Sequence, residues 1–292
     1  MSGRGNLRSI YAMLIAVAVF SLMDTALKLL TVRYPPMQVA ALRALTSLPL
    51  MLAYVGWRGA YGGFFRVRWS LQLLRGVLGI AMLSLFAYGL RAVSLAEAYS
   101  IFFIAPALIT ALSVVILKER VDAARWIAIL VGLVGVVVVL RPTGEGMLTL
   151  GGLAILCAAA CYAVSAIMAR ILGRTDRNEH VMLWLILLMS AGASALAAPT
   201  WVGVRIDDAP LLCGLAVSGF VGQLAITEAF SRGEPSSVAP LEYTALAWGV
   251  ALDWLLWRTL PDQFTLIGAA IIIGSGIYLI RHEHGHAASE HP

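Results

Sequence analysis

The stretch Ala98–Pro142 reads AYSIFFIAPALITALSVVILKERVDAARWIAILVGLVGVVVVLRP and decides the architecture of this chain. Its first part, Ala98–Leu117, carries no charge and has about the 20 residues with which an α-helix crosses a bilayer core of about 30 Å. The charged segment Lys118–Arg125 separates this run from a second apolar run, Trp126–Leu140. The stretch therefore predicts two transmembrane helices joined as a hairpin.

The composition of the whole chain indicates a membrane protein. Hydrophobic residues make up 60% of the chain and charged residues only 13%, against roughly 25% charged residues in a soluble domain. A soluble protein of 292 residues has too little interior to bury so many long apolar runs. The N-terminal sequence MSGRGNLRSIYAML lacks a small-residue cleavage site, so we interpret it as the start of the first membrane helix and not as a signal peptide.

Ten apolar spans recur along the chain, joined by segments too short for a soluble domain. Their expected limits are 9–30, 36–55, 71–90, 98–117, 126–140, 148–171, 181–202, 211–229, 236–257 and 264–280. The sequence thus predicts an all-α integral membrane protein with ten transmembrane helices.

The distribution of Lys and Arg predicts the orientation. With the N-terminus in the cytoplasm, the inside segments hold 14 of these residues and the outside segments hold 6, while Arg43 lies within a span. By the positive-inside rule, both termini are expected in the cytoplasm. The basic residues form no dense stripe, so nothing indicates nucleic acid as a partner.

The chain also repeats itself. Residues 74–140, shifted by 138 to 140 positions, fall on residues 212–280, and the first span aligns with the sixth. Each unit has five helices, and because five is odd the second unit enters the membrane upside down. Inverted repeats of this kind are typical of secondary transporters, with the substrate site between the halves near the midplane.

The residues of the hairpin resemble a known family. Ala105 and Pro106, the hexapeptide ILKERV at 116–121 and the glycine-spaced apolar helix after it resemble the EamA repeat of the drug/metabolite transporter superfamily. The second half resembles the same repeat through SSVAPLEY at 236–243. The resemblance covers nearly the whole chain.

The resemblance implies two inverted five-helix repeats around a central cavity. The expected divisions are residues 1–142 for the first repeat, 143–281 for the second and 282–292 for a cytoplasmic tail. It also implies transport, although family members move amino acids, nucleotide sugars, vitamins and drug-like amphiphiles. One departure is Trp257-Arg258, which stands where the family usually has a Glu matching Glu119 of the first half.

Two charged residues of the first spans are candidates for the substrate path. Asp24 is followed four residues later by Lys28, so the two are expected either to pair at the membrane surface or to form a charged lip of the path. Asp24 is also a candidate for proton coupling. Arg43 lies well inside the second span, where an unpaired guanidinium is costly. Its expected role is either an ion pair, with Asp24 or Glu97, or the binding of a substrate carboxylate.

The fourth span has one polar and aromatic face, formed by Tyr99, Phe103, Pro106, Thr110 and Ser113. This face either lines the cavity or packs against a neighbouring helix. Pro106 removes a backbone donor and leaves a carbonyl free, which predicts a bend or a binding point. Within the repeated pattern, Pro106 and its counterpart Pro240 are the expected hinges.

The ninth span is the matching candidate in the second half. Glu242 and Asp253 are eleven residues apart and share a helix face. A carboxyl at the depth of Glu242 marks a functional site by default, as a coupling-proton or ammonium site, unless it is a structural group paired with Arg43. Tyr243 and Trp248 add aromatic surface beside it.

The remaining candidates are polar groups on other spans. They are Tyr88 with Ser84, Tyr162 with Ser165, and Gln223 with Thr227. Glu119, at the end of the fourth span, is expected to be a salt-bridge partner of Arg125 or of the basic segment 58–68. Four of the five histidines lie in the tail HEHGHAASEHP, and neither they nor the three cysteines indicate a metal or cofactor site.

These features favour a secondary carrier of small organic metabolites that works by alternating access in the bacterial inner membrane. The predicted cargo is an exported amino acid or related zwitterion, and the alternative is uptake of a larger amphiphile such as a vitamin or nucleoside-like compound. A membrane enzyme lacks support because His180 is the only histidine outside the tail, and a channel is the other remote alternative. Expected partners are the substrate, the lipid bilayer and coupling protons, in a monomer or a homodimer.

Overall fold

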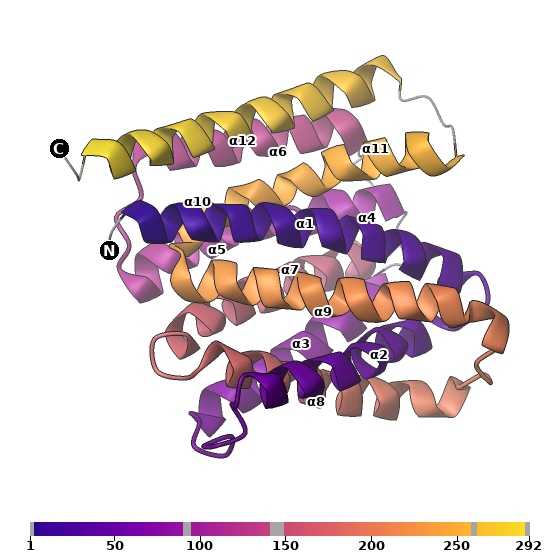
Figure 1. Ribbon diagram of the computed structural model, residues 1–292. Coiled ribbons are helices and arrows are strands. Elements are labelled where there is room, and N and C mark those ends of the chain that lie inside the picture. The colour runs from indigo at the N-terminus through magenta and orange to yellow at the C-terminus, as the bar shows by residue number, and fades with distance from the viewer. Residues whose placement is uncertain (1–2, 90–94, 141–148, 258–261, 290–292) are drawn as a thin grey trace.

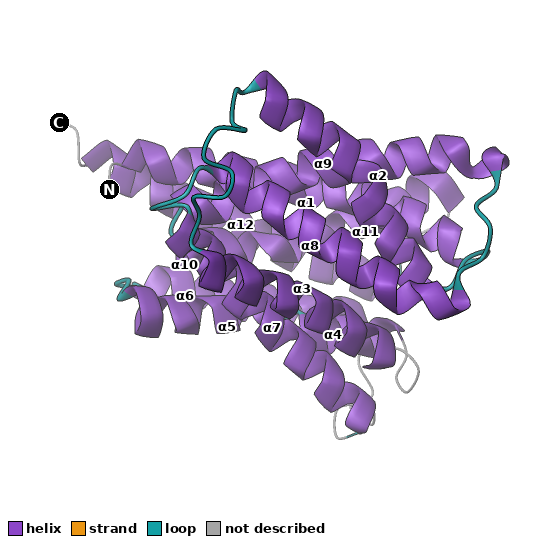
Figure 2. Cartoon of the chain, turned by 90° about the horizontal axis from the view of Figure 1, so that it is seen from below, coloured by secondary structure: helices purple, strands orange, loops and turns teal. Residues whose placement is uncertain are grey.

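Backbone hydrogen bonding explains why these apolar segments are helical. Lipid supplies no partners for N–H and C=O groups, so a spanning segment must satisfy them internally. The computed structural model describes residues 3–89, 95–140, 149–257 and 262–289, and the regular structure within those ranges is helical throughout (Figures 1 and 2).

Eight long helices account for most of the described chain. They are α1 (Gly3–Thr31), α2 (Pro36–Trp57), α3 (Trp69–Gly89), α6 (Ala123–Leu140), α7 (Leu150–Leu172), α8 (Asn178–Ala197), α9 (Ala209–Arg232) and α12 (Gln263–Ser289). Each contains a stretch long and apolar enough to cross a membrane. These helices match the predicted spans one to three, five to eight and ten.

Two further spans are broken into shorter pieces. The predicted fourth span consists of α4 (Leu95–Phe102), α5 (Ala105–Leu112) and the π-helical turn η1 (Ser113–Leu117). The predicted ninth span consists of α10 (Pro235–Val238), the 3-10 turn η4 (Ala239–Tyr243) and α11 (Thr244–Trp257). With these two spans the described chain makes ten crossings, and the predicted fold class is confirmed.

Prolines stand at both interruptions. Pro106 occupies the first turn of α5, just after the break that separates α4 from α5, where its missing N–H has no helical partner to lose. Pro240 lies in η4, inside the 3-10 segment. The bend expected from Pro106 is present, while the motion of either proline as a hinge stays a prediction.

The packing of the spans follows a two-fold pattern. The first span packs on the eighth (α1 on α9) and the third packs on the sixth (α3 on α7), so the two contacts exchange when the halves are interchanged. The second span packs on the seventh (α2 on α8) and the fifth on the tenth (α6 on α12), and each of these contacts maps onto itself. This is the pattern that a two-fold axis between inverted halves requires.

Both ends of the described chain lie at one end of the bundle. Figures 1 and 2 show that α1 begins where α12 finishes, and we call this the termini end and its opposite the far end. The expected tail at 282–292 is helical over residues 282–289, because α12 continues to Ser289. Which end faces the cytoplasm stays a prediction.

Glycines let α6 and α12 approach closely. A Cβ atom on Gly135 would lie 2.7 Å from Ile272 Cγ1 and 3.0 Å from the carbonyl oxygen of Gly268. A Cβ atom on Gly268 would lie 2.7 Å from the carbonyl oxygen of Gly135. Small residues at a membrane helix contact allow backbone-to-backbone packing of this kind.

We therefore expect Gly135→Leu to separate α6 from α12 and to lower the free energy of unfolding by about 1–3 kcal/mol, as overpacking does. Thermal unfolding of the purified protein in detergent measures the effect. The control is Gly274→Leu in α12, where an added Cβ meets nothing within 4 Å. Equal melting temperatures for the two variants would contradict the close contact.

Candidate functional site

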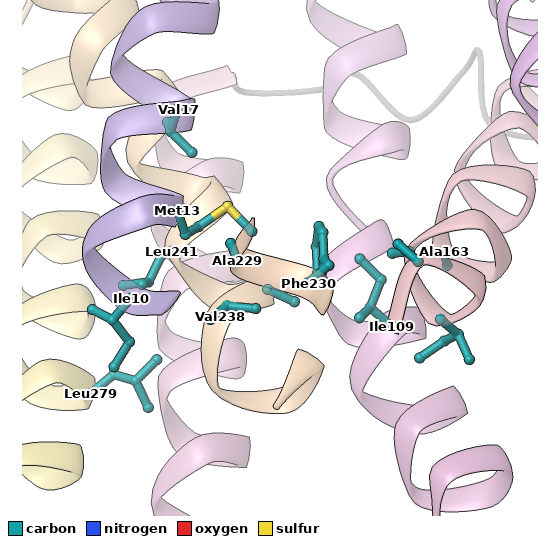
Figure 3. Packing of buried hydrophobic residues seen from close by; sticks show 14 of the residues in the cluster. Ile10, Met13, Val17, Ile109, Ala163, Ala229, Phe230, Val238, Leu241 and Leu279 are labelled. Carbon is teal, nitrogen blue, oxygen red and sulfur yellow. The ribbon is translucent and has the colours of Figure 1, made fainter. Parts of the chain in front are cut away.

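A hydrophobic cluster closes the termini end. Figure 3 shows side chains from α1, α5, α7, α9, α10, η4 and α12 meeting at one place. Ile10, Met13 and Ile109 are fully buried there, and Phe230 and Leu241 pack with them. Apolar contacts thus join the two halves and block passage through this end.

Polar contacts reinforce the closure beside the cluster. Glu119 Oε2 accepts a hydrogen bond of 2.8 Å from the Ser236 hydroxyl, and Arg125 Nη2 lies 2.8 Å from Glu234 Oε2. The Ser236 hydroxyl also accepts a hydrogen bond of 3.1 Å from Arg125 Nη1, so Ser236 links Glu119 to Arg125, while a pairing of Glu119 with the basic segment 58–68 stays a prediction. Glu119 binds the second half at the start of α10 because the hairpin folds onto it, which local charge patterns do not reveal.

The far end is held by a different set of contacts. Asp208, in the loop before α9, forms an ion pair with Arg33 and accepts a hydrogen bond of 2.7 Å from the Tyr34 hydroxyl. The Gln38 side chain donates to the carbonyl of Val202 at 2.6 Å and accepts from its N–H at 2.8 Å. These contacts fix the turn between α1 and α2 against the loop between α8 and α9.

A cavity of about 190 Å³ lies between α2, α3, α8, α9 and the C-terminal half of α1. Since α1 starts at the termini end, this cavity belongs to the far half of the bundle. Its wall is largely apolar, and among its few polar side chains are Arg43, Ser47 and Gln223. An apolar pocket with a few convergent polar groups is the usual form of a small-molecule site.

Arg43 sits at the centre of this polar group. Its guanidinium carbon lies 5.4 Å from the centre of the Phe20 ring, a cation–π distance. The Phe20 ring rests on the backbone of α9 at Gly222, where any side chain would collide with it. The charge of Arg43 also interacts with the charge of Asp24, one helical turn beyond Phe20. The Phe20 ring therefore supports one face of the Arg43 guanidinium, and the Asp24 carboxylate lies within electrostatic reach of it.

Asp24 is solvent-exposed although it lies within a membrane span, in the half that is nearer the far end. A charged side chain at this depth is tolerated only where it lines a cavity or meets a partner. The exposure of Asp24 therefore indicates that water reaches the interior of the bundle from the far end. The side chain of Lys28, its expected pairing partner, lies outside the described residues.

Tyr162 and Glu242 are joined by a hydrogen bond. The Tyr162 hydroxyl on α7 donates to Glu242 Oε1 on η4 at 2.7 Å. Tyr162 also lies within electrostatic reach of Arg43, so the two halves bring Asp24, Arg43, Tyr162 and Glu242 into one polar group. Glu242 lies in the 3-10 turn η4, directly before α11 begins at Thr244.

Aromatic rings line the region next to this polar group. Tyr99 and Phe103 have ring centres 6.4 Å apart, and Phe103 lies 6.0 Å from Tyr243. Tyr243 is completely buried and packs with Val136 and Ile272 of α6 and α12. Tyr243 therefore packs against Phe103 from the buried side, whereas Tyr99 and Phe103 are only partly buried.

The other predicted site residues do not gather at one place: Thr110 is buried, Gln223 borders the cavity, and Tyr88 and Trp248 are exposed. The Thr110 hydroxyl is buried and donates to the carbonyl of Pro106 at 3.0 Å, so it is engaged within its own helix. Gln223 borders the cavity and donates to Thr227. Tyr88 and Trp248 are 52% and 45% exposed, and their contact with substrate stays a prediction.

Sequence reasoning missed two residues near the polar group. Phe20 precedes Asp24 by one turn, and this spacing was the available signal. Arg75 is 5% exposed, donates to the Val181 carbonyl at 3.1 Å and lies within electrostatic reach of Tyr162. The count of Lys and Arg in the inside segments includes Arg75, and only packing shows that α3 carries it into the bundle.

The comparisons with known proteins agree over the length of the chain. The EamA-like transporter family matches residues 7–141 and 149–281. A solved crystal structure superposes with a TM-score of 0.81 at 19% identity, covering 95% of this chain and 96% of its own. This second similarity concerns the fold alone.

Three curated relatives are named as transporters. The chain is 24% identical to the pseudopaline exporter CntI of Pseudomonas aeruginosa, over 93% of this chain and 95% of that protein. It is 26% identical to a riboflavin transporter of Vibrio cholerae, over 93% and 92%. It is 25% identical to an S-adenosylmethionine uptake transporter of Rickettsia prowazekii, over 95% and 94%. These names indicate transport and not an enzymatic reaction.

We expect the cavity to be accessible from the far end only. In a variant without native cysteines, Asp24→Cys should react with a membrane-impermeant maleimide added on the far side, because Asp24 is exposed. Met13→Cys, at 0% exposure in the closing cluster, should stay unlabelled from both sides. Labelling of both positions at similar rates would contradict a bundle closed at one end.

Proposed function

Because the chain belongs to the EamA-like transporter family, we propose that it is a secondary carrier that exports amino acids or related zwitterionic metabolites. It works by alternating access in the bacterial inner membrane, with both termini in the cytoplasm, as a monomer or a homodimer. Residues 1–142 and 143–281 form its two repeats.

The juxtaposition of opposite charges in the interior carries this proposal. Arg43 and Asp24 come from neighbouring spans, and their charges interact in the part of the bundle that water reaches. A zwitterion offers a carboxylate to Arg43 and an ammonium group to Asp24, so that each fixed charge finds a partner. A purely apolar cargo would offer neither charge a partner and would displace water from both, which is costly at membrane depth.

The aromatic side chains supply the complementary surface for the organic part of the cargo. Tyr99 and Phe103 lie on the broken fourth span, and Phe86 contributes both to the cavity and to a ring contact with Tyr99 at 6.0 Å. Aromatic side chains offer a large apolar area for contact. They therefore admit a range of side chains, while the charged pair selects the zwitterionic end.

Glu242 is the proposed coupling group. Its carboxyl accepts a hydrogen bond from the Tyr162 hydroxyl, and a protonated carboxyl keeps an oxygen that can still accept this bond. Proton uptake at Glu242 would change the charge of the site without breaking the contact between α7 and η4. In this antiport, the entry of a proton down its gradient drives the export of a substrate molecule.

The alternative is uptake of a larger amphiphile such as a vitamin or nucleoside-like compound. The aromatic wall supports it, as do two relatives that carry the names of riboflavin and S-adenosylmethionine transporters. A relative named as an exporter supports the other direction. The two proposals make different predictions: only a carrier of zwitterions should transport a small amino acid.

The decisive experiment is counterflow in proteoliposomes. Liposomes preloaded with one unlabelled amino acid, from a panel that also contains vitamins and nucleosides, should accumulate the same labelled compound. Arg43→Gln should weaken apparent affinity roughly 10- to 100-fold, since a hydrogen bond to a charged group contributes about 1.5–3 kcal/mol. The matched control is Arg66→Gln on the exposed loop before α3, which should transport normally. Counterflow of vitamins or nucleosides alone would favour the alternative.

A second measurement tests the coupling role. Glu242→Gln keeps an acceptor for the Tyr162 hydroxyl but cannot bind a proton, so we expect exchange to continue while the stimulation by a pH gradient disappears. Tyr162→Phe removes the hydrogen bond and leaves the carboxyl, so it should keep the pH response. A full pH response in Glu242→Gln would show that another group carries the proton.

A further inference from the structure

A charged pocket lies at the termini end, away from the cavity that Arg43 borders. Its volume is about 650 Å³, and α1, α2, α9 and the loop between α7 and α8 surround it. Four arginines contribute to its wall: Arg8, Arg58, Arg177 and Arg232. Their side chains are between 48% and 68% exposed, so they remain open to a ligand.

Two carboxylates share these four guanidinium groups. Glu228 lies 3.0 Å from Arg8 Nη2 and 3.0 Å from Arg232 Nε. Glu179 lies 3.2 Å from Arg58 Nε and 3.5 Å from Arg177 Nε. Each guanidinium carries five N–H donors, far more in total than two carboxylates accept. The surplus donors face an open pocket.

The charge balance of the wall indicates a single negative charge as the missing partner. The pocket wall holds four arginines against Asp176, Glu179 and Glu228, which leaves one positive charge uncompensated. Gln72 and Thr175 donate hydrogen bonds to Asp176, but these donors are neutral, so the negative charge of Asp176 stays in this balance. A phosphate diester carries one negative charge and several acceptor oxygens.

The floor of the same pocket is apolar and continues along the membrane-spanning helices. It includes Ala12 and Ile15 of α1, Val221 and Leu224 of α9, and Tyr54 of α2. Ile15 is 52% exposed on a helix that crosses the membrane, so the groove opens toward the lipid chains. A charged rim above an apolar groove fits an amphiphile whose head and tail lie along the membrane normal.

We propose that this pocket binds an anionic phospholipid, with its phosphate diester among the four arginines and one acyl chain along α9 beside Ile15. Basic pockets between transmembrane helices are the usual receptors of anionic headgroups. Because Arg8 and Arg58 belong to the first repeat and Glu228 and Glu179 to the second, the bound lipid bridges the two halves at their closed end. The site is independent of the transported substrate.

Native mass spectrometry of the purified full chain tests the proposal directly. With phosphatidylglycerol and phosphatidylcholine offered at equal concentration, we expect one tightly held phosphatidylglycerol and no comparable phosphatidylcholine adduct. Inorganic phosphate added in excess should not displace the lipid, because it lacks the acyl chain. Equal retention of both lipids, or displacement by phosphate, would overturn the assignment.

Variants locate the site. Arg8→Gln combined with Arg232→Gln should weaken phosphatidylglycerol binding about 30-fold, since each basic residue near the surface contributes roughly a factor of five. The matched control, Arg66→Gln with Arg120→Gln, removes the same charge from exposed positions outside the pocket and should bind normally. An equal loss in both double variants would show a general charge effect and would refute the specific site.

Discussion

The cost of placing charge in hydrocarbon governs this structure. Lipid offers no partner for a guanidinium or a carboxylate, so each one within a span must face a partner or water. Asp24 and Arg43 meet this requirement by facing each other in the interior of the bundle. Glu242 meets it through the Tyr162 hydroxyl. Because burial of an unpaired charge in lipid is unfavourable, Asp24, Arg43 and Glu242 lie together in the interior of the bundle.

The inverted repeat relates the two ends of the bundle to each other across the site between the halves. Interchanging the halves maps the contact of α1 with α9 onto that of α3 with α7. The pieces of the two broken spans face each other across the axis, since α5 contacts both α10 and η4. The cluster around Met13 closes the termini end, while Asp24 is exposed toward the far end. Because the halves are alike in fold, the alternating access proposed above requires only that they exchange roles.

The two ends are held together by different interactions. The closed termini end combines an apolar cluster with the contacts of Glu119 and Arg125 to the start of α10. The far end is fixed by hydrogen bonds of Gln38 and Tyr34 at its rim. An apolar cluster can separate without leaving unsatisfied polar groups, provided that water or substrate replaces it. The rim contacts need polar replacements, which the aqueous phase supplies.

The sequence by itself determined the membrane class, the ten spans, the five-helix repeat and most residues that carry charge inside the membrane. Hydropathy and repeat spacing are properties of the chain alone, and lipid leaves the backbone no choice other than the helix. The tertiary structure decided which of these groups meet. Phe20 beneath Arg43, Tyr162 at Glu242, Ser236 at Glu119 and the inward path of Arg75 all join separate spans. Their contacts depend on helix rotation and on breaks in the fourth and ninth spans. The packing of neighbouring helices sets both, and a one-dimensional pattern does not contain it.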